Sequence, residues 1–332
     1  NPPKFIWVQT AAEARELLNT VVGIDMVMSM YNVTDKEVFT LASEIKRERP
    51  GLPFVLLTHF SKEVYRRLAL QDMSAIDHIF CWHGNADLIV AIVKLFEDIR
   101  NAEHDILGAG VQAILLVEDS VRFYSTYLPE LYKMILMQTS EFLKETLNEQ
   151  QKKIRKRSRP KILLATNYDD AIELYNKYKN NLLGVISDVG FTLHKNESAE
   201  DEVLDAGIRL ARYIKEDDPM MPILLQSSQG SLSSVAQELG VGFLKKYSKT
   251  LMLQLSDYIK EEFGFGDFVF RDADRVECGR ASNLKELELQ MKIVPDSVLL
   301  AATSKNMLSK WLYARGLFTL GATFKAVQES HF

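Results

Sequence analysis

The chain has 332 residues, of which 47% are apolar and 26% are charged, as in ordinary globular proteins of two or three domains. Its formal net charge of -5 disfavours a general nucleic-acid binder, which would usually be basic. No apolar run approaches the roughly 18 residues that a membrane span needs, and the N-terminus lacks the pattern of a signal peptide. Cys81 and Cys278 lie far apart and match no metal-ligand spacing, which favours a reducing cytoplasm.

Residues 1–105 alternate short apolar runs with helical patterns, which predicts a small α/β domain. Four runs predict strands, namely KFIWVQT (4–10), VMSMYN (27–32), LPFVLLTHFS (52–61) and DHIFCWH (77–83). Two amphipathic stretches predict helices, AAEARELL (11–18) and ADLIVAIVKLFEDIR (86–100).

Residues 106–264 repeat a strand-then-helix unit five times. The expected strands are 112–117, 161–166, 182–187, 222–227 and 242–247, and the expected helices are 121–156, 169–178, 203–215, 231–239 and 250–263. Strands that are apolar along their whole length are typical of parallel sheets covered by helices on both faces. With right-handed crossovers, the simplest topology is a doubly wound α/β sheet. The basic stretch Lys152–Arg159 is expected to be a solvated helix end, and the alternative is a contact with a phosphate backbone.

Polar residues follow several of these strands where each strand ends. Glu118 and Asp119 follow the first strand, Asp188 ends the third, Ser227 ends the fourth and Lys246 lies in the fifth. Ligands of doubly wound sheets bind beyond the carboxyl ends of the strands. Three carboxylates at one edge would repel one another unless a cation joined them, and this donor set suits Mg²⁺.

The runs ILLVEDS (114–120), VISDVG (185–190), PILLQSS (222–228) and FLKKY (243–247) resemble the receiver domain of two-component response regulators. The resemblance covers residues 112–264 and implies a flavodoxin-like five-stranded sheet. It implies that Asp188 accepts a phosphoryl group from a sensor histidine kinase or a phosphotransfer protein. A phosphatase of the haloacid-dehalogenase type would need a second Asp two residues later, where Gly190 stands.

The resemblance also implies roles for the neighbouring residues. Glu118, Asp119, Asp188 and the main-chain carbonyl of Gly190 would hold Mg²⁺. Ser227 would bond the phosphoryl oxygens and Lys246 would pair with them. Phe243 stands where the family has its switch aromatic. Such a domain is a regulatory phosphoacceptor and not an enzyme in its own right.

Two departures from the family pattern stand out. Tyr247 replaces the proline, normally preceded by a cis bond, that usually follows the lysine, which puts the local turn in doubt. FTLHKNESAEDEVLDA (191–206) is longer than the usual connection after the phosphoacceptor strand. Its NESAEDE core is an acidic, solvated loop by composition, and it is either a lid or recognition loop or a tolerated surface insertion.

The first domain resembles a second, degenerate receiver. Met30 falls where Asp188 stands, Thr58 matches Ser227, and Trp82 matches Lys246. Its first strand and helix are absent, either because they lie upstream or because they are missing. We expect a packing or dimerisation module. Part of the broad apolar face of residues 86–100 would cover its own sheet, and the rest would meet either a partner domain or a second chain in a homodimer. The alternative is an α/β domain of another function.

The tail, residues 265–332, predicts a hairpin around DADR (272–275) followed by helices. Residues 297–318 faintly resemble a segment of bacterial phosphoenolpyruvate-synthase-like multidomain proteins, which would make this chain the regulatory part of a longer polypeptide. The resulting hypothesis is a signal-transduction receiver that acts in a phosphorelay. It is expected to bind neither nucleic acid directly nor a membrane. The alternative is a pseudo-receiver that is never phosphorylated and serves as a scaffold.

Overall fold

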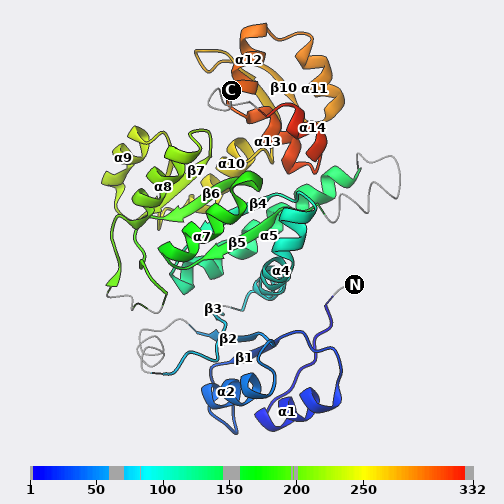
Figure 1. Cartoon of the computed structure of the whole chain (residues 1–332), viewed down its shortest axis with the longest axis vertical. Coiled ribbons are helices and arrows are strands. Elements are labelled where there is room, and N and C mark those ends of the chain that lie inside the picture. The colour runs from blue at the N-terminus through cyan, green and yellow to red at the C-terminus, as the bar shows by residue number, and fades with distance from the viewer. Residues whose placement is uncertain are drawn as a thin grey trace. The chain divides into compact units, whose positions relative to one another are not determined.

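The computed structural model describes residues 3–59, 71–82, 84–144, 158–195, 197 and 201–325 (Figure 1). The chain divides into two compact units. The first contains residues 1–93 and 120–129, and the second contains residues 94–119 and 130–332. The division therefore falls within two helices, α4 (Ala86–Ala102) and α5 (Val121–Lys144).

The first unit is built on three parallel strands in the order β1-β2-β3. They are β1 (Val27–Met30), β2 (Phe54–Thr58) and β3 (His78–Cys81). Helix α1 (Ala11–Thr20) begins where the Thr10 side chain accepts a hydrogen bond from the Glu13 amide, a standard N-cap. Apolar residues of α1 and α2 (Val38–Glu48), including Leu18 and Leu41, join one hydrophobic cluster with the strands.

The second unit holds five parallel strands in the order β5-β4-β6-β7-β8. They are β4 (Ala113–Val117), β5 (Lys161–Ala165), β6 (Leu182–Asp188), β7 (Ile223–Ser227) and β8 (Gly242–Lys245). This is the flavodoxin-like order, in which the second strand lies at one edge and the first strand beside it. The predicted doubly wound parallel sheet is confirmed.

Helices cover both faces of this sheet. They are α5, α7 (Tyr168–Tyr178), α8 (Ala206–Asp217), α9 (Ser233–Glu238) and α10 (Leu251–Glu262). Helix α4 is followed by a π-helical segment, Glu103–Gly108. Two 3₁₀ turns cover Lys179–Asn181 and Gly230–Leu232. Helix α5 continues through Pro129, and the predicted extension from 145 to 156 lies outside the described residues.

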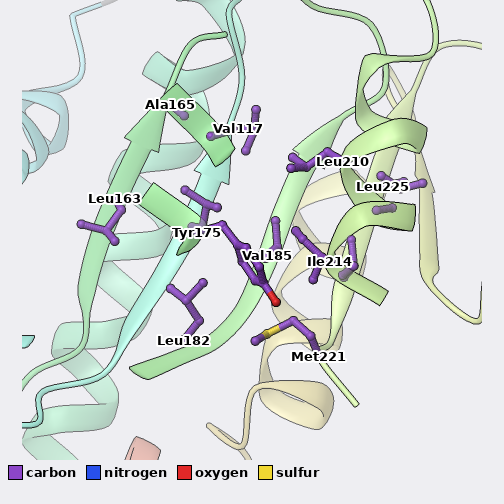
Figure 2. Packing of buried hydrophobic residues seen from close by; sticks show 14 of the residues in the cluster. Val117, Leu163, Ala165, Tyr175, Leu182, Val185, Leu210, Ile214, Met221 and Leu225 are labelled. Atoms are coloured by element: carbon purple, nitrogen blue, oxygen red, sulfur yellow. The ribbon is translucent and has the colours of Figure 1, made fainter. Parts of the chain in front are cut away.

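The main core of the second unit lies between the sheet and helices α7, α8 and α9 (Figure 2). Tyr175 of α7 and Ile214 of α8 pack there against strand residues such as Val185, and all three are fully buried. On the opposite face, the Phe263 ring lies where a side chain on Gly184 would stand, so this glycine lets α10 approach the sheet closely.

A buried ion network joins α4, α5 and the start of β5. The Asp98 carboxylate accepts hydrogen bonds from both terminal nitrogens of Arg159 (2.5 and 3.1 Å) and from Tyr132 Oη (2.9 Å). The amide of Ile162 adds a further bond at 3.0 Å. The expectation of a solvated end is therefore wrong for Arg159, because the buried carboxylate of Asp98 provides the partner that burial of a guanidinium requires.

The tail forms the predicted hairpin, with β9 (Phe268–Arg271) antiparallel to β10 (Glu277–Ala281). Four helices follow, α11 (Leu284–Met291), α12 (Asp296–Ser304), α13 (Met307–Ala314) and α14 (Phe318–Thr323). Trp311 is fully buried among them and donates to the carbonyl of Gly266 at 2.9 Å. Among the described residues, no helix is both long and apolar enough to cross a membrane.

The prediction of a strand over KFIWVQT (4–10) is wrong. Residues 3–8 have no regular structure, and a bend follows at residues 9 and 10. Phe5, Ile6 and Trp7 remain 62%, 57% and 83% exposed. In the second unit, the corresponding strand β5 pairs only with β4. The described part of the first unit contains no counterpart of β4, so this segment has no neighbour with which to form a ladder.

Candidate phosphoacceptor and cation site

Three carboxylates meet at the carboxyl edge of the second sheet. Asp188 ends β6, while Glu118 and Asp119 directly follow β4, and the register pairs Val117 with Ser187. Oxygen atoms of the three carboxylates lie within 4.8 Å of one another. Glu118 is buried and the other two are half-buried. The strands thus hold three like charges in place, as their positions in the sequence predict.

Lys246 lies against two of these carboxylates. Its Nζ forms an ion pair with Glu118 Oε2 at 2.8 Å and another with Asp188 Oδ2. The main-chain amide of Lys246 donates to the carbonyl of Ser227 at 2.8 Å, which fixes the end of β8 to the end of β7. Burial alone would lower the pKa of Lys246, but the two carboxylates raise it, so the lysine stays charged.

The remaining negative charge is only partly balanced. Burial, followed by the charge of Asp188, raises the pKa of Glu118 to about 8 and the pKa of Asp119 to about 7. Two carboxylates about 4 Å apart repel by roughly 4 kcal/mol at an effective dielectric of 20. Both carboxyl groups therefore resist ionisation unless a cation joins them.

The donor set fits a hard divalent cation. Glu118, Asp119 and Asp188 offer carboxylate oxygens at mutual distances that one ion could span. Mg²⁺ prefers oxygen ligands and commonly takes only a few protein carboxylates while it keeps several waters. The main-chain carbonyl of Gly190, two residues after Asp188, is the fourth protein ligand that the resemblance to receiver domains implies, and this stays a prediction.

The two remaining predicted residues also lie on β7 and β8. Ser227 is buried, and its Oγ accepts a hydrogen bond from the amide of Gln229 at 3.1 Å. Phe243 pairs with Leu225 in the ladder and packs, half-buried, against the main core. Ser227 therefore lies at the same sheet edge as the carboxylates, while Phe243 lies further back along β8.

Three features of the site could not be anticipated from the strand pattern. Gln226 is buried and pairs in register with Asp188, and no described residue hydrogen-bonds its side-chain amide. Glu202, from the acidic insertion, adds its negative charge to those acting on Asp119. Gly207 of α8 lies directly against the main chain at Asp188. The sequence offers only weak signals for these features. Gln226 is a polar residue within an apolar strand, and glycines lie at both ends of the acidic insertion.

The turn after Lys246 is formed by a residue in the left-handed region. Tyr247 has φ of 65° and is exposed. The peptide bonds of the described residues are all trans. The chain thus completes this turn without the proline and the cis bond of the family pattern.

The first unit repeats the backbone arrangement of the site. The amide of Trp82 donates to the carbonyl of Thr58 at 2.8 Å, as Lys246 does to Ser227. These hydrogen bonds place Trp82 and Thr58 at the ends of β3 and β2, in the positions that Lys246 and Ser227 hold in the second sheet.

Met30 occupies the corresponding end of β1. Tyr31, the next residue, donates its amide to the carbonyl of Leu57 in β2 at 2.9 Å. In the second sheet, Val189 likewise donates its amide to the carbonyl of Gln226 in β7 at 3.0 Å. The thioether of Met30 has no carboxylate oxygen that could accept a phosphoryl group. The indole of Trp82 carries no positive charge that could balance such a group. The first unit therefore has the framework of the site without its chemistry.

Comparisons with known proteins found structural neighbours only. No family model and no curated protein matches the chain. A response regulator receiver domain protein from Clostridium thermocellum is 18% identical, with a TM-score of 0.28, over 45% of this chain and 92% of that one. Two structures of two-component system response regulator/GGDEF domain proteins are 17% and 16% identical, each with a TM-score of 0.30, over 76% of this chain and 85% of theirs. The second unit has the flavodoxin-like order of five parallel strands, and these three solved structures are of response regulator proteins.

Proposed function

We propose that the second unit is a Mg²⁺-dependent receiver that accepts a phosphoryl group on Asp188. The observation that carries this proposal is the environment of the Asp188 carboxylate. Its Oδ1 accepts the amide of Val189 at 2.7 Å and its Oδ2 pairs with Lys246, next to the two carboxylates that follow β4. An aspartate fixed at a strand end beside a lysine and a set of cation ligands is suited to in-line phosphoryl transfer.

The donor would be a phosphohistidine of a sensor histidine kinase or a phosphotransfer protein. One carboxylate oxygen of Asp188 forms a bond to phosphorus while the P–N bond breaks, and the imidazole leaves with the electron pair and takes up a proton. Lys246 then pairs with the phosphoryl oxygens. When bound by Glu118, Asp119, Asp188 and the Gly190 carbonyl, the cation supplies positive charge that offsets the negative charge of the transferred group.

The switch would follow from two residues behind the site. The Ser227 hydroxyl would turn from its contact with Gln229 and donate to a phosphoryl oxygen, drawing the β7 end toward Asp188. That movement would give the half-buried Phe243 ring room to turn inward. The output would be regulation of a partner or of a larger polypeptide in the cytoplasm, with the first unit as a packing or dimerisation module. The likeness of the tail to phosphoenolpyruvate-synthase-like proteins stays a prediction.

Intact-mass spectrometry after incubation with acetyl phosphate tests this proposal. The wild-type chain should gain a single phosphoryl adduct when Mg²⁺ is present and none when Mg²⁺ is chelated. Asp188→Asn should gain none, whereas Asp296→Asn, which changes an exposed aspartate of the tail, should behave as wild type. An adduct on Asp188→Asn would contradict the assignment. A wild-type chain that binds Mg²⁺ and gains no adduct from acetyl phosphate or a phosphohistidine donor would instead support the pseudo-receiver scaffold.

A further inference from the structure

The acidic insertion after β6 returns to the site at its far end. Phe191 and Val203 form an isolated antiparallel bridge, in which the Val203 amide donates to the Phe191 carbonyl at 3.1 Å. Phe191 is fully buried in the main core, so the bridge is anchored three residues after Asp188. Glu202, the neighbour of Val203, is thereby held next to the end of β6.

The Glu202 carboxylate fills the space that a side chain on Gly190 would occupy. A Cβ atom built on Gly190 would overlap Glu202 Oε1 and lie 3.2 Å from its Cδ. Gly190 is the residue whose carbonyl we assign to the cation, and the charge of Glu202 also acts on Asp119. The close approach to Gly190 therefore places the Glu202 carboxylate beside a residue that we assign to the cation.

Glu202 has no ion-pair partner among the residues that the structure describes. Within the described part of the chain, its carboxylate makes no hydrogen bond either. Its side chain is exposed, so it could turn away from the other acids at little cost. In its place against Gly190, this carboxylate adds negative charge next to the proposed cation ligands, and a bound cation would favour that position.

We infer that Glu202 supplies a fourth carboxylate to the divalent-cation site of the second unit and strengthens cation binding there. The inference rests on the proposed function, and it gives the acidic insertion a definite role as a carrier of one cation-binding group. Carboxylates that surround a metal site commonly change its affinity by about tenfold or more when they are removed.

Two variants test the role of Glu202 by different routes. Glu202→Gln removes the charge and keeps the shape. Gly190→Ala keeps the carboxylate and displaces it, because the three atoms nearest to the added Cβ all belong to the Glu202 side chain, whose far end can turn away. The matched control is Glu238→Gln, which makes the same charge change at an exposed position of α9.

Isothermal titration of the full chain with Mg²⁺ supplies the measurement. We expect Glu202→Gln and Gly190→Ala each to weaken Mg²⁺ binding by about tenfold. The double variant should be no weaker than either single variant, because both remove one interaction. Glu238→Gln should match the wild type.

Each other outcome has a definite meaning. Wild-type affinity in Glu202→Gln would overturn the role of Glu202 and leave the proposed function standing. An additive loss in the double variant would show that Gly190→Ala acts by another route, and would remove that support. A wild-type chain that binds no Mg²⁺ would overturn the proposed function and this inference together.

Discussion

Glu118 and Asp119 have carboxyl groups whose pKa values are higher in the folded chain than in the unfolded chain. They therefore link the stability of the fold to pH. Burial and the charge of Asp188 raise their pKa values to about 8 and about 7, against roughly 4 in an unfolded chain. Between these limits the folded state binds more protons than the unfolded state. The contribution of these two groups to the free energy of unfolding is therefore largest below about pH 4 to 5. It falls as the pH rises from there through 7 and 8.

We expect the cation-free second unit to lose stability between about pH 5 and pH 9, and saturating Mg²⁺ to suppress that loss. The cation favours the ionised carboxylates, so the folded state no longer holds the extra protons. Urea unfolding followed at several pH values, with a chelator or with Mg²⁺, measures both effects. Glu118→Gln should flatten the pH dependence in the chelator series. A cation-free stability that rose across this range would contradict the assigned environment of the two carboxyl groups.

At the scale of elements, the site depends on how closely α8 approaches the end of β6. Gly207 lies in the first turn of α8, and its amide donates to the carbonyl of Val189 at 2.8 Å. A Cβ on Gly207 would overlap the main-chain oxygen of Asp188 and lie 2.8 Å from the Val189 Cα. Because the obstacle is backbone, a side chain here would displace the helix or the strand end that carries Asp188, the proposed phosphoacceptor.

Gly207→Ala should lower the free energy of unfolding by about 1–3 kcal/mol, the usual cost of overpacking a close contact, and should slow phosphorylation of Asp188. Gly108→Ala is the matched control, because a Cβ at Gly108 meets nothing within 4 Å. Chemical unfolding and the rate of adduct formation with acetyl phosphate give the two readouts. Equal stability of the two variants would show that α8 does not depend on this contact.

At the scale of the whole molecule, the segment that follows the acid pair belongs to the first unit. Residues 120–129, the start of α5, group with residues 1–93. Tyr124 Oη donates to the carbonyl of Ile79, and Ser125 Oγ accepts the amide of Cys81 at 2.9 Å. The acid pair is thus followed directly in the chain by residues that are hydrogen-bonded to β3 of the first unit.

We therefore expect phosphorylation to change assembly or domain packing and not to start catalysis within this chain. Small-angle scattering and light scattering, with and without beryllofluoride and Mg²⁺, measure this on the full chain. Asp188→Asn under the same conditions should show no change. An unchanged profile and mass, with the mimic shown to be bound, would contradict the expectation and would assign the output to domains outside this chain.

The sequence by itself determined the second sheet and the residues along its carboxyl edge, where we propose the site. Five apolar runs, each followed by a helical pattern, predict parallel strands, and parallel strands bring their carboxyl ends to one edge. Asp188, Glu118 and Lys246 could therefore be grouped before any distance was known, because each stands at the end of its own strand. The same reasoning placed Met30 and Trp82 in the first sheet.

Only the tertiary structure decided which segments find a partner. KFIWVQT has the pattern of a strand, but the described residues offer it no neighbouring strand, and a ladder needs two. Arg159 reads as a solvated end, yet it is buried because Asp98, far away in sequence, accepts both of its donors. Glu202 reads as part of a solvated acidic loop, and it reaches the site because Phe191 pairs with Val203 and Gly190 leaves it room. Local patterns specify elements, whereas pairing between distant residues depends on packing that no local pattern records.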